Sequence, residues 1–250
     1  MTNAAAGMTT RPTASVAVVN ASTVCEDIEI ESYIGALQEQ VTSDFASVWG
    51  ADARLQFIAE GEKPDLSSWW LVILDNSDQA GMLGYHDLTP AGLPIGKVFA
   101  KTDQDNGLYV SVTMSHELLE MLADPGINMM TSSNDDRGNP VFYAYEACDA
   151  CEDDSYGYTI ERVRVSDFVY PGWFEGVMAA QFDHGGHITA PLEILSGGYI
   201  GQWTPSTGWT QLTGSSAHGA AHRSRAGVGS RRERRQAGRN RWTLSTALGT

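Results

Sequence analysis

The first half of the chain alternates between two hydrophobic periods. The apolar run at 15–20 (SVAVVN) predicts a short buried strand. An amphipathic helix is expected over about 24–49, because apolar residues recur there every three or four positions (Ile34, Leu37, Val41, Phe45 and Val48). Thr23 and Glu26 form a capping-box pattern at its start, and Gly50 can end it. Alternation at 54–58 and a continuous apolar run at 69–74 predict a half-buried strand followed by a more central one.

The pattern then leads to a second helix. A loop rich in glycine and proline over 81–96 precedes a strand at 97–101, and a helix follows over about 108–123, which Asn106 can cap and Pro125 ends. Further on, 142–146 and 158–165 alternate as short strands or a hairpin, whereas 169–202 has little periodicity. This order predicts one α+β domain over 15–213, with helices packed on one face of a mixed sheet.

The helix over 108–123 is apolar around most of its circumference, through Leu118, Leu119, Met121, Leu122 and Ala123. A helix of this kind is buried. His116, Glu117 and Glu120 therefore lie in an apolar environment, where carboxylates need partners.

These three polar residues have the spacing of a metal site. Residues four apart on a helix differ by about 40° around the axis and about 6 Å along it, so His116 and Glu120 share one face and can hold one ion. The pattern is the zincin motif H-E-x-x-H with Glu, a competent zinc ligand, in place of the second His. Glu117 is then left to take a proton from water activated by the metal. The alternative is that His116 and Glu117 only cap or hydrogen-bond in the core.

A catalytic zinc needs a third protein ligand from another segment. The candidate is Glu146, which lies in an apolar and aromatic stretch (FYAYEACDAC), with Asp149 as the alternative. Asp124 is two helical turns from His116, roughly 12 Å along the axis, so we expect it to accept hydrogen bonds from a ligand or from the next loop. Zinc held by His116, Glu120 and Glu146 would be formally uncharged.

The other histidines and the cysteines give weaker evidence of a functional role. His184 and His187 form an H-x-x-H in a glycine-rich loop, where exposed polar residues are commoner than metal ligands, and His86 is a candidate substrate contact. The three cysteines are too few for a disulfide scaffold. Cys148 and Cys151 form a lone C-x-x-C, which we interpret as a local disulfide or two ordinary thiols rather than a redox or metal site.

Charge divides the chain into two parts. Residues 1–213 hold 8 Lys and Arg against 30 Asp and Glu, whereas 214–250 hold 8 Arg against one Glu. The acidic part is not expected to bind nucleic acid, which leaves the Arg-rich tail as the segment that could. Residues 1–14 and the tail 214–250 are expected to be disordered from their composition. No apolar run approaches 18 residues and no signal peptide is recognisable, so we expect no membrane partner and leave the localisation open.

The segments SHELLEMLADP, YEACD, VSDFVYPGWF and APLEILSGGY resemble a zinc metallopeptidase-like family of bacteria and phages that carries an H-E-x-x-E motif. The first two segments are also distantly similar to the EXORDIUM or phosphate-induced protein family. The resemblance covers about residues 80–200. It implies a zincin-like fold, Zn²⁺ as cofactor, His116, Glu120 and Glu146 as metal ligands, and Glu117 as the general base.

By this resemblance the expected function is zinc-dependent hydrolysis of a peptide or protein substrate. Zincin folds further imply that the strand at 97–101 lies at the sheet edge, where an extended substrate can pair with it. A tyrosine is expected to stabilise the oxyanion, and the sequence does not choose among Tyr143, Tyr145, Tyr156 and Tyr158. The alternative is a non-catalytic protein in which a metal staples a loop to the helix. Glu117 then has no catalytic role, and Asp149 or Cys148 fills the fourth coordination position of the metal.

Overall fold

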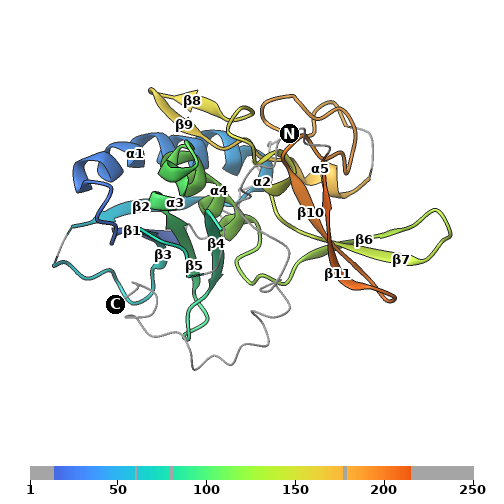
Figure 1. Ribbon diagram of the computed structural model, residues 1–250, viewed down its shortest axis with the longest axis horizontal. Helices are drawn as coiled ribbons and strands as arrows, with labels where there is room; N and C mark the ends of the chain where they lie inside the picture. The colour runs from blue at the N-terminus through green and yellow to red at the C-terminus, as the bar shows by residue number, and fades with distance from the viewer. Residues whose placement is uncertain (1–13, 60, 79–81, 177–178, 215–250) are drawn as a thin grey trace, which may run out of the picture.

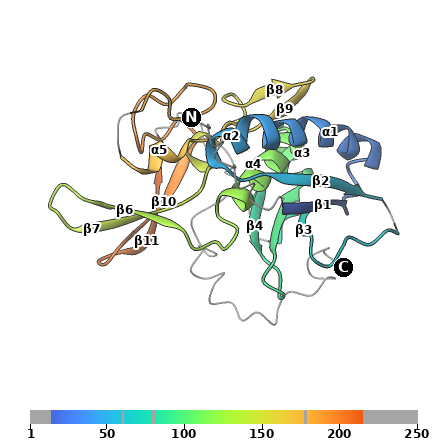
Figure 2. The same ribbon diagram turned by 180° about the vertical axis from the view of Figure 1, so that it is seen from behind.

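The computed structural model describes residues 14–59, 61–78, 82–176 and 179–214. A five-stranded sheet carries helices on one face, and a second, antiparallel sheet extends away from it (Figure 1 and Figure 2). The predicted combination of helices with a mixed sheet is confirmed, whereas the zincin-like fold stays a prediction. The two segments expected to be disordered, 1–14 and 214–250, lie outside the described residues except for Ala14 and Gly214. Among the helices described, none has the length and apolar character needed to cross a membrane.

The central sheet has the strand order β2-β1-β3-β5-β4. In chain order its strands are β1 (Ala14–Asn20), β2 (Ala53–Ile58), β3 (Trp69–Leu74), β4 (Gly84–Leu88) and β5 (Pro94–Phe99). Strands β2, β1, β3 and β5 are parallel neighbours, and β4 pairs antiparallel with β5 at the edge. The apolar run at 69–74 is a central strand, as predicted.

The predicted edge strand at 97–101 is wrong. Residues 97–99 belong to β5, which lies between β3 and β4, and 100–101 begin a helix. The segment interpreted as a loop over 81–96 holds β4 and the start of β5. Thr89 accepts an amide hydrogen bond from Gly92 and donates one to Leu93, so the Gly/Pro-rich stretch is a tight hairpin turn that folds β4 back along β5.

The long helix predicted over 24–49 consists of α1 (Asp27–Glu39), a π-helical segment (Gln40–Phe45) and α2 (Ala46–Trp49). It ends as predicted at Gly50, which has φ 64°. The capping box at its start does not form. The Thr23 hydroxyl donates to Asp75 at 2.6 Å, and Ser22 donates to the same carboxylate, so the end of β3 holds this turn and the helix begins at Asp27.

Two further helices follow the last strand of the central sheet. Helix α3 (Ala100–Asp105) follows β5 directly, and α4 (Val110–Ala123) corresponds to the helix predicted over 108–123. All 14 residues of α4 are buried, as its apolar circumference predicts. Asn106 does not cap α4, because its amide donates to the Thr102 carbonyl at the end of α3. Asp124 leaves the helical conformation (φ −132°, ψ 71°) before Pro125 and ends the helix.

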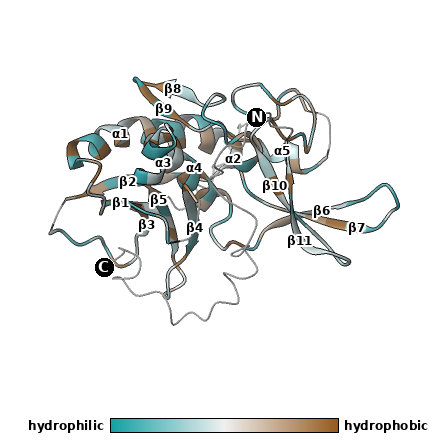
Figure 3. Ribbon diagram, in the orientation of Figure 1, coloured by the Kyte–Doolittle hydropathy of each residue, from teal (hydrophilic) through white to brown (hydrophobic). Residues whose placement is uncertain are grey.

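The main core lies between the sheet and the layer of α1 and α4. It contains Ile30 and Leu37 of α1 and Leu118 and Leu119 of α4, together with Leu71 from β3 and other sheet residues. Helix α1 buries Ile30, Ala36 and Leu37, and its mixture of hydrophobic and hydrophilic residues appears as brown and teal patches in Figure 3. Helix α4 is therefore enclosed by the sheet on one side and by α1 on another.

The second sheet has the order β11-β10-β7-β6. In chain order its strands are β6 (Met130–Asn134), β7 (Pro140–Ala144), β10 (Tyr199–Thr204) and β11 (Gly208–Thr213). Its β6–β7 hairpin projects from the body and ends in a hydrophilic tip (Figure 3). The hairpin predicted over 158–165 is present as β8 (Tyr158–Ile160) and β9 (Val163–Val165), and α5 (Pro171–Phe174) is a short helix in the otherwise irregular stretch that follows. The β10–β11 pair was not predicted.

Candidate metal centre

Two histidines and five carboxylates meet beside the sheet edge. Edge strand β4 supplies one residue, α4 supplies three, the segment after β7 supplies one, and the 3₁₀ turn Asp149–Cys151 with the residue after it supplies two. We call these residues the His–carboxylate cluster: His86, His116, Glu117, Glu120, Glu146, Asp149 and Glu152. Each is more than nine-tenths buried. Buried carboxylates at this density need protons or cations as counterions.

One half of the cluster is arranged around a single imidazole nitrogen. His116 Nε2 lies 3.4 Å from Glu120 Oε1 and 3.3 Å from Asp149 Oδ1. Tetrahedral zinc with bonds of about 2.0–2.1 Å places its ligand atoms about 3.4 Å apart, so each of these two separations matches that expected across a shared ion. Glu152 offers a further oxygen, since ligand atoms of His116, Asp149 and Glu152 all lie within 4.8 Å of one another.

The predicted third ligand, Glu146, lies in the other half of the cluster. Its Oε2 is 3.6 Å from His86 Nε2, while His86 Nδ1 is 3.3 Å from Glu120 Oε2. Ligand atoms of His86, Glu120 and Glu146 also lie within 4.8 Å of one another. The structure thus brings His116 and Glu120 together as predicted, and it places the alternative ligand Asp149, rather than Glu146, beside the His116 nitrogen.

Sequence reasoning missed two members of the cluster as possible ligands. His86 was expected to contact substrate, yet it is 4% exposed and faces three carboxylates. The predicted ligand set does not include Glu152. A signal for it exists, because Asp149 and Glu152 are three residues apart and side chains at this spacing point the same way in a 3₁₀ turn.

The predicted base, Glu117, points from α4 toward the sheet edge. A Cβ atom at Gly84 would lie 2.6 Å from Glu117 Oε1, and one at Gly96 would lie 3.4 Å from Glu117 Cβ. Glycine on both β4 and β5 therefore makes room for this side chain. Glu117 Oε2 lies 3.6 Å from His86 Nδ1 and, within the described part of the chain, accepts no hydrogen bond.

Burial and mutual charge set the proton affinities in the cluster. Burial raises the pKa of Glu117 and, with the charge of Glu120, raises the pKa of Asp149 well above its usual range. Burial opposes ionisation of Glu120 too, but His116 and His86 outweigh it and lower the Glu120 pKa. Conversely, burial lowers the pKa of His86, and the facing carboxylates overcome it and raise that pKa to about 10. Positive charge is therefore strongly favoured at the centre of the cluster.

A second layer of hydrogen bonds holds α4 in position. Ser115 donates to Gln40 at 2.6 Å and accepts from the Ser166 amide, while Gln40 donates to the Ser166 carbonyl, which closes a buried ring beside His116. The Cys148 amide donates to Glu120 Oε1 at 3.2 Å. These contacts fix the carboxylate that both halves of the cluster share.

Asp124 accepts hydrogen bonds from the amides of Asn128 and Met129 in the next loop, one of the roles predicted for it. Cys148 and Cys151 are buried free thiols, and burial raises the pKa of each, which disfavours redox chemistry there.

The remaining candidates lie apart from the cluster. His184 packs on Phe168 and Tyr158, and His187 packs on Tyr156, so the H-x-x-H joins neither group of potential ligands among the described residues. Tyr158 is engaged as a hydrogen-bond donor to Asp44. The other three candidates for the oxyanion, Tyr143, Tyr145 and Tyr156, remain predictions.

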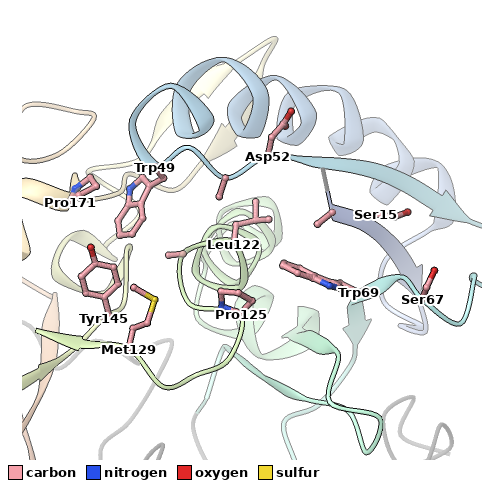
Figure 4. A pocket seen from close by; sticks show the side chains of 13 residues that line it. Ser15, Trp49, Asp52, Ser67, Trp69, Leu122, Pro125, Met129, Tyr145 and Pro171 are labelled. Atoms are coloured by element: carbon pink, nitrogen blue, oxygen red, sulfur yellow. The ribbon is translucent and has the colours of Figure 1, made fainter. Parts of the chain in front are cut away.

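A cavity of about 820 Å³ lies near the end of α4 (Figure 4). Trp49, Trp69, Leu122, Met129 and Tyr145 line much of it, so it is largely apolar. No cluster residue lines this cavity, although Tyr145 directly precedes Glu146. The cavity and the cluster are therefore separate features that meet at the segment after β7.

Comparison of the chain with protein-family models, curated proteins and solved structures finds no match.

Proposed function

We propose that this protein is a zinc-dependent peptidase in which Glu117 is the general base. The observation that carries the proposal is that the three polar side chains of the α4 motif point in two different directions. His116 and Glu120 face the same point as Asp149, whereas Glu117 turns toward the sheet edge with a carboxylate oxygen that accepts no hydrogen bond within the described residues. The H-E-x-x-E pattern and its resemblance to zinc metallopeptidase-like proteins agree with these roles.

The donor set suits zinc. His116, Glu120 and Asp149 would hold the ion, with Glu146 or Glu152 as further oxygen ligands, and imidazole plus carboxylates are ordinary zinc ligands. A bound zinc supplies Lewis acidity, which lowers the pKa of water and polarises a carbonyl.

The chain's own residues would then handle the proton. Glu117 takes a proton from the attacking water and passes it to the leaving amine. His86, 3.6 Å from Glu117 Oε2, orients that carboxylate.

The fold is compatible with a zincin-like enzyme. The helix with the H-E-x-x-E motif packs against β5 and the antiparallel edge strand β4, and an edge strand is where an extended peptide can be added to a sheet. In this proposal β4, rather than the 97–101 segment, takes the role of the substrate-pairing strand.

The competing function is a non-catalytic protein whose metal ties the 146–152 segment to α4. The observation that favours it is the full burial of the cluster together with four nearby protein ligands, His116, Glu120, Asp149 and Glu152. A closed four-ligand site is typical of structural zinc.

Chelation separates the two functions. If the protein is a peptidase, purified full-length protein hydrolyses a mixed peptide library, loses this activity with a chelator and regains it with zinc. His116→Ala should lose the zinc ion assigned to His116, Glu120 and Asp149 and show no activity. If chelation lowers the melting temperature while no zinc-loaded sample cleaves any peptide, the structural function replaces the catalytic one.

A further inference from the structure

We infer that the His–carboxylate cluster binds two metal ions, with Glu120 as the carboxylate that bridges them. The first ion is that of the proposed function, held by His116 and Asp149 together with Glu120, and here Glu152 is its further oxygen ligand. The second is held by His86 and Glu146. The inference rests on the metal site of the proposed function but not on peptide hydrolysis.

The carrying observation is the orientation of Glu120. Its two oxygens face different histidines, with Oε1 at 3.4 Å from His116 Nε2 and Oε2 at 3.3 Å from His86 Nδ1. A carboxylate that offers one oxygen to each of two sites is the usual bridge in two-metal centres, where the ions lie about 3.5–4 Å apart. The Cys148 amide hydrogen bond to Oε1 keeps the carboxylate in this orientation.

Each half of the cluster has a ligand group of its own. The atoms of His116, Asp149 and Glu152 fit within 4.8 Å of one another, and so do those of His86, Glu120 and Glu146. In the second group, His86 turns one nitrogen to Glu120 and the other to Glu146. One ion bonds to only one of these nitrogens, and a single ligand atom from each of His86, Glu120 and Glu146 already lies within 4.8 Å of the other two.

The charge of the cluster also favours a second cation. Its carboxyl groups outnumber its imidazoles by five to two, and all seven groups are buried. One divalent ion balances two of the five carboxylates, and a second balances two more. Glu117 Oε2, buried and 3.6 Å from His86 Nδ1, lies beside the second position and would orient a water there.

The test is the metal stoichiometry of the full-length protein. Metal-free protein is titrated with Co²⁺ and followed by visible absorption and electron paramagnetic resonance. We expect two equivalents to bind, with the signal of the first ion weakened by spin coupling when the second binds. A single equivalent overturns the inference, and His86 is then a protonated counterion for the carboxylates.

Variants locate the second ion. His86→Asn should bind one equivalent and lose the coupling, whereas His187→Asn, which changes an exposed imidazole outside the cluster, should still bind two. If His86→Asn does not fold by circular dichroism, Glu146→Gln replaces it with the same expectation. Two equivalents in either folded cluster variant contradict the ligand assignment.

The result is distinguishable from that of the proposed function. Two ions without peptide hydrolysis support this inference and refute the peptidase. One ion with hydrolysis does the reverse, and no bound ion refutes both.

Discussion

Gly84 and Glu117 make a contact that only glycine allows: a Cβ atom at position 84 would lie 2.6 Å from the Glu117 Oε1 atom and 2.9 Å from its Cγ atom. The edge strand β4 and the motif helix α4 are thus fitted to each other at the proposed base. Lys97 O would also lie 2.9 Å from that Cβ, so the backbone of β5 closes the space from another side.

This contact predicts that Gly84→Ala displaces Glu117. We expect peptide hydrolysis to fall on the order of 10²-fold with zinc content unchanged, because a misplacement of about 1 Å can cost that much. Hydrolysis rates and elemental analysis of the folded variant check it. Gly35→Ala is the matched control, since its nearest neighbour would be 4.0 Å away on the exposed side of α1. Unchanged hydrolysis in Gly84→Ala would show that the Glu117 position is not critical.

Zinc affinities of two variants can decide whether Asp149 or Glu146 is the third zinc ligand. Because Asp149 Oδ1 lies 3.3 Å from His116 Nε2 and Glu146 faces His86, Asp149→Asn should weaken the tightest zinc ion by more than about 100-fold, beyond the 10–100-fold typical of outer partners. Glu146→Gln should weaken the same ion by less than about 10-fold. Competition with a chromophoric chelator measures both. The reverse order would restore Glu146 as the third ligand, as the sequence predicted.

Much of the helix layer could be predicted from the sequence because its signals are local. The apolar spacing of Ile34, Leu37 and Val41 gave the long helix, and Pro125 gave the end of α4. The capping box failed because Asp75, far away in the sequence, offers Thr23 a better partner. The edge strand was misassigned because β4 contains the polar pair His86 and Asp87, whose burial depends on packing against α4 and β5 and not on the local pattern.

For the candidate site, only the residues on α4 could be predicted from local sequence. His116, Glu117 and Glu120 follow from helical spacing alone. The positions of Glu146 and Asp149 around them depend on how the chain returns from the second sheet, and this sheet pairs β7 with β10 more than fifty residues later. No local pattern records that pairing. The contribution of His86 was equally hidden, because it comes from the misassigned strand.

A buried carboxyl pair outside the cluster predicts a pH dependence of stability. Burial and the neighbouring Asp183 raise the pKa of Asp167 to about 8. Since this folded-state pKa lies above the ordinary value, the folded protein holds a proton that the unfolded chain releases, and stability is lost as the pH rises from about 4 through 8. Asn at this position resembles the protonated acid. Asp167→Asn should therefore be more stable than wild type at pH 8.5, by on the order of 2–5 kcal/mol, and this difference should shrink as the pH falls and vanish only near pH 4.

Denaturant unfolding of wild type and variant across this pH range measures the effect. Asp136→Asn, a change at the exposed tip of the β6–β7 hairpin, is the control and should follow wild type at every pH. If Asp167→Asn follows wild type as well, then Asp167 is ionised in the folded protein at neutral pH and the pair shares no proton.

The central claim, that Glu117 is the base of a zinc peptidase, is tested most directly by Glu117→Gln. Glutamine keeps the size of the side chain and its contact with Gly84 but cannot accept the proton. Peptide hydrolysis by wild type and variant is measured at equal, independently determined zinc content. We predict that the variant retains its zinc and loses about 10²–10⁴-fold in kcat/KM, the range typical of general-base catalysis. A zinc-loaded Glu117→Gln protein that hydrolyses peptides as fast as wild type would contradict the account.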